Sequence, residues 1–258
     1  LIKEEQGVER IVANIAQVGV EAASVIPDIV STTVNALPVS KRMRWGRTRY
    51  DFLRPVQWLV LLLGDSTLPL ELFGRRSGRE SRGHRFHANH AVSIAAPSDY
   101  IEALRQAKVI ADVDERRAQV AEQVSQLQGK GEQVALSKEL LDEVTGLVEW
   151  PVALRGSFDQ GFLDVPAQAL ISAMKTHQKY FHLTDQETGA LLPAFITVAN
   201  IESQQPSEVI AGNERVIRPR LSDAAFFFAN DKQSTLSSRQ ERLSSVIFQR
   251  ELGSLLDK

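Results

Sequence analysis

The hydrophobic pattern predicts helices at both ends of the chain. Apolar residues recur at helical spacing between residues 7 and 36, and we expect Pro27 to separate two helices there. From Pro206 the pattern is again typical of helix, and it continues to Lys258. The aromatic run Phe226–Phe228 cannot all face water, so we expect it to anchor this last helical region in the core.

The middle of the chain begins with strand patterns. Val56–Leu63 is a continuous apolar run, and Gly64 with Asp65 predicts a turn after it. Leu68–Phe73 alternates enough to be a returning strand. The stretch Arg75–Gly83, rich in Gly and Arg, is predicted to be a loop.

Helices with clear starting signals come next. Pro97 opens a short helix, and Asp112 is a good N-cap for a longer one. Glu115, three residues after Asp112, would complete an approximate capping box. Ser137 caps a further helix that reaches Leu147.

Strand patterns then return. We expect strands at Val148–Leu154, Tyr180–Leu183 and Ala194–Val198. Pro166 marks the start of a helix between the first two, and Asp185–Gly189 is typical of a hairpin turn.

This order of elements predicts an α+β architecture, with mixed strands flanked by helices, rather than a regular βαβ array. We divide the chain into an N-terminal helical segment (residues 1–40), an α+β domain (41–205) and a C-terminal helical segment (206–258). The chain begins at Leu1 rather than Met, which indicates a piece of a longer protein. No apolar run reaches the roughly 18–20 residues that a membrane span requires, so we expect no membrane partner.

Composition narrows the class of protein. Hydrophobic residues at 43% and charged residues at 24% are ordinary for a soluble globular protein and exclude collagen, mucin and wholesale disorder. The chain has no cysteine, which excludes disulfides, cysteine-ligated metal sites and a cysteine nucleophile. This cysteine usage favours the cytoplasm.

A net charge of −2 conceals an uneven distribution. Between Lys41 and His87 there are eleven Lys and Arg against four Asp and Glu, whereas between Asp99 and Glu149 there are six against eleven. Two interpretations stay open. The two segments are solvated faces that offset each other, or the basic one is a strip that binds the phosphates of a nucleic acid.

Several familiar site motifs are absent. The sequence has no phosphate-binding P-loop, no dinucleotide-binding Gly-x-Gly-x-x-Gly turn and no Gly-x-Ser-x-Gly elbow. His84, His87 and His90 stand three residues apart, and in a strand such neighbours point to opposite faces. We therefore expect no metal site.

Two stretches combine cations with aromatic residues. In Lys41–Trp45 the cations can neutralise phosphates and Trp45 can stack on a base, or the segment is a basic loop with a tucked Trp. Lys175–Phe181 holds two cations and a histidine beside aromatics. It suits a polar pocket or an RNA contact, the alternative being a helix end followed by a half-buried strand.

Gly212–Phe228 is the most distinctive run. It contains three closely spaced arginines, Arg215, Arg218 and Arg220. They either pair with Glu214 or Asp223 as part of a structural helix, or reach outward together. Pro219 is expected to break or kink the helix at this point.

Taken together, these motifs resemble the beta subunits of bacterial tetrameric glycyl-tRNA synthetases. The matching motifs, in order, are Lys41–Gly46, Arg54–Leu59, Ser81–Phe86, Lys175–Phe181 and Gly212–Phe228. The resemblance covers nearly the whole chain, with Pro219 as a departure from the helix-compatible residue expected there.

The resemblance implies an α2β2 ligase that attaches glycine to tRNA with ATP. ATP and Mg would bind at the alpha subunit, which carries the class II adenylating site, so this chain would hold no cofactor, no metal and no catalytic residue. Its fold would be similar to the B3/B4 region of the phenylalanyl-tRNA synthetase beta subunit. An HD-type and an anticodon-binding domain would follow, and the lack of a His-Asp dipeptide indicates that the chain stops before them.

The implied role is a non-catalytic part of this cytoplasmic ligase that binds tRNA(Gly) and supports the alpha subunit. The alternatives are an editing-type hydrolase acting on mischarged tRNA, with His84, Lys175 and His177 as its polar groups, and a pure scaffold. The candidate RNA-binding residues are Lys41, Arg42, Arg44, Trp45, Arg47, Arg82, His84, Arg85, Lys175, His177 and Lys179. Arg215, Arg218 and Arg220 are candidates for contact with RNA or with the alpha subunit.

Overall fold

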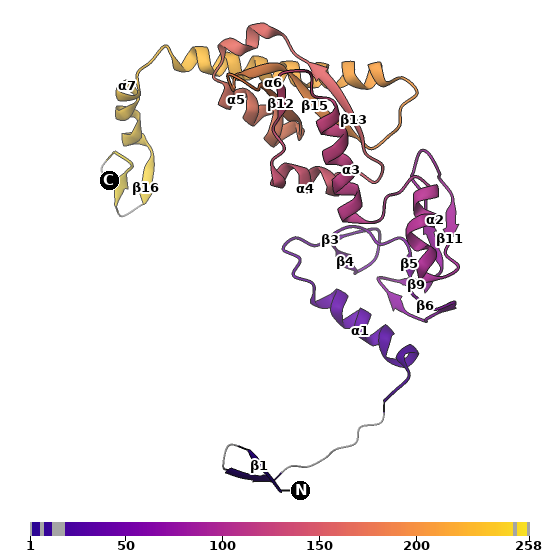
Figure 1. Cartoon of the computed structure of the whole chain (residues 1–258). Coiled ribbons are helices and arrows are strands. Elements are labelled where there is room, and N and C mark those ends of the chain that lie inside the picture. Colours follow the sequence, from indigo (N-terminus) through magenta and orange to yellow (C-terminus); the bar gives the residue numbers. More distant parts are fainter. Residues whose placement is uncertain (1, 6–7, 12–18, 250–251, 257–258) are drawn as a thin grey trace. The chain divides into compact units, whose positions relative to one another are not determined.

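The computed structural model describes residues 2–5, 8–11, 19–249 and 252–256 (Figure 1). The chain divides into two compact units. The first comprises Leu1–Arg82 with His90–Ala103, and the second comprises Gly83–Asn89 with Leu104–Lys258. The mixture of helices with antiparallel strands confirms the α+β class. The three segments drawn from the sequence stay a prediction.

The N-terminal region contains strands and one helix, so helix is confirmed for the second half of the predicted region, while the predicted separation at Pro27 and the helix at Val8–Ile11 are wrong. β1 (Ile2–Glu5) and β2 (Val8–Ile11) pair antiparallel, and the single helix α1 (Ala22–Ala36) passes through Pro27. Four residues are too few to distinguish the helical from the strand period, which explains the error at β2. In α1, Pro27 leaves the carbonyl of Ala23 without its helical donor, but Ala23 is exposed and water can replace that bond. The rest of the predicted helix, residues 12–18, lies outside the described ranges.

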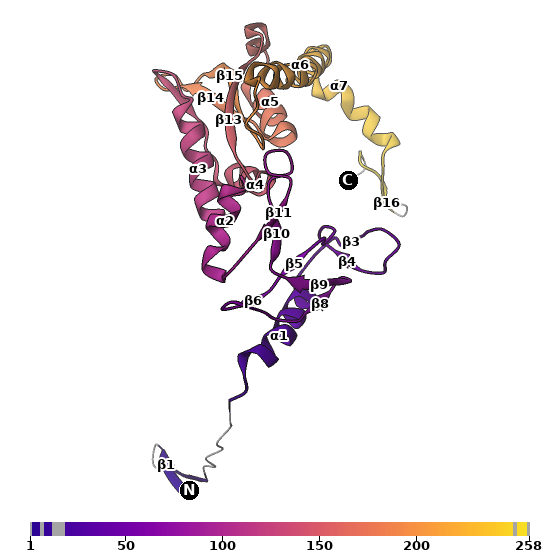
Figure 2. The ribbon, with the colours of Figure 1, turned by 90° about the vertical axis from the view of Figure 1, so that its right-hand side faces the viewer.

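Short strands make up the rest of the first unit (Figure 2). Three antiparallel pairs form: β3 (Met43–Arg44) with β4 (Asp51–Phe52), β6 (Leu62–Leu63) with β7 (Ser66–Thr67), and β10 (Glu80–Arg82) with β11 (Ala91–Ser93). A three-stranded sheet has the order β5 (Leu59–Val60), β9 (Arg75–Gly78), β8 (Glu71–Leu72). The turn at Gly64 is confirmed, with φ +59°. The strand that returns from it is β7, while β8 pairs with β9 instead.

The predicted loop Arg75–Gly83 is wrong, because β9 and β10 occupy most of it. Gly and Arg have weak strand propensity, so the tertiary pairings decide here. Ser77 adds side-chain bonds. Its Oγ accepts from the backbone N of Leu70 at 2.8 Å and donates to the carbonyl of Leu68 at 2.6 Å.

The second unit is built on a four-stranded antiparallel sheet. Its strand order is β12 (Glu132–Val134), β14 (Phe181–Asp185), β15 (Leu191–Ala199), β13 (Val152–Ser157). The predicted strands at Tyr180–Leu183 and Ala194–Val198 are confirmed, as is the turn at Asp185–Gly189. β12 was not predicted, because Glu132–Val134 has no period to detect. β13 begins four residues later than predicted.

Helices cover both faces of this sheet. On one face, α3 (Val113–Gln126) and α4 (Lys138–Leu147) share a core with alternate residues of β15. The 3-10 turn Pro97–Asp99 and most of α2 (Tyr100–Gln106), which precede them in the chain, belong to the first unit. α5 (Ala167–Ser172), a π-helical turn at Ala173–Gln178 and α6 (Pro206–Asp231) form a second core, on the other face. In β15, Ala194 and Ile196 belong to the first core, and Leu191 and Phe195 belong to the second.

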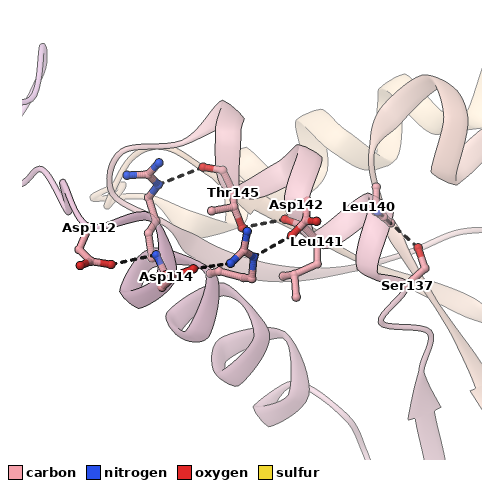
Figure 3. Close-up of polar contacts among 9 residues, drawn as sticks. Asp112, Asp114, Ser137, Leu140, Leu141, Asp142 and Thr145 are labelled. Carbon is pink, nitrogen blue, oxygen red and sulfur yellow. Dashed lines mark hydrogen bonds and ion pairs between the residues drawn. The ribbon is translucent and has the colours of Figure 1, made fainter. Parts of the chain in front are cut away.

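Side-chain caps fix α3 and α4 (Figure 3). Asp112 accepts bonds from the backbone N of Asp114 and of Glu115, each at 2.9 Å, and Ser137 accepts one from Leu140, which confirms both predicted N-caps. The predicted capping box is wrong, because the Glu115 carboxylate pairs with Arg105 instead of the Asp112 backbone.

Two arginines of α3 reach α4 (Figure 3). Arg117 lies 2.6 Å from the Asp114 carboxylate and 2.7 Å from that of Asp142, which joins the two helices. Arg116 donates from Nε to the carbonyl of Thr145 at 3.0 Å, near the end of α4. The Arg116 bond satisfies a carbonyl in the last turn of α4 that the helix itself cannot pair.

α6 is continuous through Pro219, so the predicted break is wrong. The carbonyl that loses its donor belongs to Arg215, which is exposed, while Ile217 and Leu221 on the inner face are fully buried and hold both halves of the helix. The aromatic anchor is wrong in part. Phe228 packs against the core, but Phe226 and Phe227 are 66% and 61% exposed.

Helix does not continue to the C-terminus as predicted. α7 (Leu236–Gln240) and a 3-10 turn at Glu241–Ser245 are followed by a hairpin of β16 (Ile247–Gln249) and β17 (Gly253–Ser254). The β-branched and aromatic residues of β16 favour a strand, and Gly253 supplies the positive φ, +84°, beside the turn.

Glu132 and Arg155 join β12 to β13. Arg155 Nη2 donates to Glu132 Oε1 at 2.8 Å, and the backbone N of Gly129 donates to Glu132 Oε2 at 2.7 Å. These donors lower the pKa of Glu132 to about 2. Since the pKa in the unfolded chain is about 4.3, the pair stabilises the fold fully above that pH, and the contribution is lost as the pH falls towards 2.

We therefore expect Glu132→Gln to lower the free energy of unfolding at pH 7 by about 1–2 kcal/mol, because both partners are partly solvated. The difference from wild type should shrink steadily between pH 5 and pH 2. Urea denaturation at each pH measures it, with Glu122→Gln on the exposed side of α3 as the control. An equal loss at pH 7 and pH 3 would contradict this assignment.

Candidate nucleic-acid interface

The basic segment after α1 contains both exposed and engaged cations. Lys41, Arg44 and Arg47 are exposed. Arg42 is engaged at the end of α1, where its Nη2 donates to the carbonyls of Asn35 and Leu37 at 3.3 and 3.4 Å and its Nη1 lies 3.5 Å from Asp51. Arg42 therefore caps the helix by donating hydrogen bonds to carbonyls at its C-terminal end.

Trp45 is tucked rather than free. Its ring is half-buried and packs edge-on against Phe73, with the centroids 6.0 Å apart. This geometry favours the tucked alternative for Trp45, while the exposed cations beside it keep the basic strip available for phosphates. A surface hollow next to Arg42 is also lined by Arg49 and Tyr50, which were not among the predicted residues.

His84 is buried, with 1% of its surface exposed. Its Nδ1 accepts bonds from the backbone N of Phe86 at 3.2 Å and of His87 at 3.3 Å, so the ring proton lies on Nε2, which donates to the carbonyl of Asn200 at 2.8 Å. All polar atoms of the ring are used. This arrangement favours a structural role, and contact of His84 itself with RNA stays a prediction.

A polar cluster surrounds this histidine. The His87 ring packs at a tilt against the His84 ring with centroids 4.7 Å apart, and its Nε2 accepts from the backbone N of Glu202 at 2.9 Å. Lys108 lies 3.0 Å from the Glu202 carboxylate and 4.5 Å from the centroid of the Trp150 ring, and it lowers the pKa of Glu202. Residues 83–89 are thereby joined to the chain after α2 and to the end of β15.

Asn200 completes the cluster. Its side-chain oxygen accepts from the backbone N of Glu149 at 2.7 Å and of Trp150 at 2.9 Å, which keeps these residues out of β13. Sequence reasoning missed Asn200, Glu202 and Lys108, because the residues they contact are distant in the sequence. Asn200, for example, is 116 positions from His84.

The second cationic motif is also partly engaged. Lys179 adopts a left-handed conformation (φ +61°) and pairs with Glu143 at 2.8 Å. Lys175 is half-buried and His177 is exposed. Burial, and secondarily the charge of Lys175, lowers the pKa of the neighbouring His182.

Tyr180 ties this motif to α6. Its hydroxyl donates to the side chain of Asn213 at 2.6 Å, and its ring stacks on Phe195 with centroids 4.5 Å apart. Burial raises the pKa of Tyr180 to about 12. The segment therefore positions α6 against the sheet.

The arginines of α6 point away from the core. The Glu214 carboxylate accepts from the backbone N and the hydroxyl of Ser157 at 2.8 and 2.9 Å, and in the described ranges neither it nor Asp223 pairs with an arginine. The pairing that the structural alternative expects is therefore not present among the described residues, and the role of these arginines stays a prediction. α6 has many exposed residues, among them Asp223, and we call six of them the α6 outer surface: Arg215, Val216, Arg218, Arg220, Phe226 and Phe227.

Among the residues that the structure describes, no group of three or more His, Asp or Glu side chains lies close enough together to hold a metal ion. Likewise, none of the described helices combines the length and the apolar character that crossing a membrane requires.

Comparison with known proteins identifies relatives along the chain. The family model described as "Glycyl-tRNA synthetase beta subunit" matches residues 1–258. A "Glycine--tRNA ligase beta subunit" from Chromohalobacter salexigens is 54% identical over 241 residues, which cover 93% of this chain and 35% of that protein. Proteins of the same name from Pseudomonas fluorescens and Azotobacter vinelandii are each 52% identical over the same shares. The chain thus spans about a third of the length of these relatives.

We expect His84→Ala to destabilise the second unit, because it opens a cavity and leaves the carbonyl of Asn200 and two backbone N–H groups unpaired. The loss should be about 2–4 kcal/mol. Thermal unfolding measures it, with the exposed His90→Ala as the matched control. Equal melting temperatures for the two variants would show that the cluster does not hold the loop.

Proposed function

The chain belongs to the glycyl-tRNA synthetase beta subunit family, and on that basis we propose that it serves the ATP-dependent ligation of glycine to tRNA without catalysing it alone. In this proposal an alpha subunit binds ATP and Mg and forms the adenylate. This chain binds tRNA(Gly) in the cytoplasm and supports the alpha subunit. The name "beta subunit" printed for the relatives supports the partnership.

The observation that best supports RNA contact is the α6 outer surface. Its three arginines are exposed, and within the described residues no carboxylate pairs with them. The helix that carries them is held by Ile217 and Leu221 in the core, so the guanidinium groups project from a fixed backbone. Cations of this kind gain free energy from phosphates, because phosphate contacts release condensed counterions.

Each unit also carries further exposed cations that are candidates for phosphate contact. Lys41, Arg44, Arg47, Arg82 and Arg85 all lie at the surface. Arg42 and Lys179 are occupied by the protein itself, so we expect them to contribute less to phosphate binding. The phosphate contacts should therefore come from the exposed subset.

The hydrolase alternative has little geometric support. A hydrolase needs a side chain free to activate water, and His84 has both ring nitrogens occupied by the backbone. Lys175 and His177 lie in the same π-helical turn, but their exposure differs. Lys175 is half-buried, whereas His177 is exposed. Release of the amino acid from a mischarged tRNA by the full-length subunit would nevertheless revive this alternative.

We expect replacement of Arg215, Arg218 and Arg220 by Ala in the full-length subunit to weaken tRNA binding and leave the melting temperature nearly unchanged. Each lost phosphate contact lowers the slope of log K against log salt by about 0.7–0.9. Filter binding between 50 and 200 mM salt measures the affinity for tRNA and the salt slope. Lys130→Ala with Lys138→Ala, two exposed cations on other elements, is the control. If the wild type, the triple variant and the control all show the same salt slope, the arginines of α6 make no phosphate contact and the helix has a scaffold role.

The same arginines should matter in catalysis by the complex. Arg218→Ala should lower aminoacylation by the complex reconstituted with the alpha subunit, and Arg218→Lys should restore part of it because it keeps the charge. If the variant instead loses alpha subunit in gel filtration, the surface is a subunit contact.

We also expect this chain without the alpha subunit to show no exchange of pyrophosphate into ATP in the presence of glycine. It has no P-loop and no recognisable nucleotide-binding motif. Radiolabel exchange measures this, with the reconstituted complex as the positive control. Robust exchange by a preparation free of alpha subunit would overturn the non-catalytic role.

A further inference from the structure

The loop Gly83–Asn89 exposes most of an aromatic ring, that of Phe86, whose one ring contact among the described residues is with His84, with the centroids 6.2 Å apart. Phe86 is 72% exposed, although burying a Phe side chain stabilises a fold by roughly 1.5–3 kcal/mol. Its neighbours behave differently, since His84 and Ala88 are buried and His87 is half-buried. The loop therefore turns Arg85 and Phe86 outward and the residues around them inward.

The loop is held in this form by bonds at both ends. The backbone N of His84 donates to the carbonyl of Ala107 at 2.9 Å, and that of Ala88 donates to the carbonyl of His84 at 2.9 Å. Within the turn, His84 Nδ1 accepts a hydrogen bond from the backbone N of Phe86. Phe86 thus stands on a fixed backbone and loses little conformational freedom on binding.

Close packing also prevents the loop from relaxing. A Cβ atom on Gly83 would lie 2.4 Å from the carbonyl oxygen of Ala88 and 2.9 Å from the Cβ of Ala107. Only glycine allows the backbone at this position to approach Ala88 and Ala107 this closely. The turn that carries the exposed ring is therefore tightly specified.

The charge beside the ring indicates what it binds. The guanidinium carbon of Arg85 lies 5.8 Å from the Phe86 ring centroid, and in the described part of the chain no carboxylate pairs with Arg85. The loop Gly83–Asn89 contains no Asp or Glu. A flat apolar face next to an unneutralised cation matches a nucleotide, which presents a base and a phosphate.

We propose that Arg85 and Phe86 form a finger for one unpaired nucleotide of RNA, in which Phe86 stacks on the base and Arg85 binds the adjoining phosphate. This inference rests on the proposed function and specifies where a single-stranded part of the RNA is held. A protein partner fits less well, since a stable protein interface buries about 800 Å² on each side and this loop offers one ring. Stacking tolerates any base, so the finger adds affinity rather than sequence preference.

The test compares variants of the full-length subunit in complex with the alpha subunit, with tRNA(Gly) as the probe. Phe86→Ala should weaken tRNA binding by about tenfold, within the range of one lost stacking contact, and leave the salt slope unchanged. Phe86→Trp should retain the affinity. Arg85→Ala should lower the slope by about 0.7, the value for one single-strand phosphate.

Controls separate this inference from the proposed function. Leu147→Ala, an apolar side chain exposed on α4, should change neither affinity nor slope. If wild type binds no tRNA, both the function and the finger are overturned. If wild type binds and Phe86→Ala binds equally well, only the finger is overturned.

A photoreactive benzophenone amino acid at position 86 identifies the partner directly. Crosslinking to an unpaired nucleotide of the tRNA supports the finger. Crosslinking to the alpha subunit alone would show a protein contact and overturn it. Because most of the side chain is exposed, these variants should melt close to the wild-type temperature. A clearly lowered melting temperature would show that the contact of Phe86 with His84 is structural and would contradict the finger.

Discussion

Burial of β15 on both faces is the constraint on which the second unit depends. Alternate residues of this strand enter different cores, with Ala194 and Ile196 on the side of α3 and α4 and Phe195 on the side of α5 and α6. Because side chains alternate along a strand, a slip of one residue would exchange the two cores. Gly156, paired with Phe195, enforces the register, since a Cβ there would lie 2.5 Å from the Phe195 ring.

The same strand places both proposed contact surfaces. On one face, Phe195 stacks against Tyr180, and the Tyr180 hydroxyl donates to the side chain of Asn213 in α6. These contacts hold α6 against the sheet with its arginines facing outward. Directly after β15, Asn200 accepts from His84 and so fixes the loop that exposes Phe86. The two surfaces share no residue. They nevertheless depend on one strand, so damage to the β15 core should affect both, whereas an exposed substitution should affect one.

Local signals in the sequence were sufficient for many elements. The N-caps Asp112 and Ser137, the turn at Asp185 and the strand at Ala194–Val198 depend on neighbouring residues, and all were predicted correctly. Several errors arose where partners outside the segment decide. β9 becomes a strand through pairing with β5 as well as with the neighbouring β8, and α6 continues past a proline because buried residues hold it on both sides. The burial of His84 has the same origin, because no local pattern points to Asn200.

The candidate cations also show why composition alone cannot define an interface. A cation contributes to phosphate binding only if the protein has not already neutralised it, because a paired side chain must give up its partner and its geometry first. Arg42 caps α1 and Lys179 pairs with Glu143, although both lie in motifs as basic as the rest. Arg218 and Arg85 have no such carboxylate within the described residues. The net charge of a segment therefore overstates its phosphate contacts, and the unpaired, exposed cations on fixed backbone provide the better estimate of where RNA would lie.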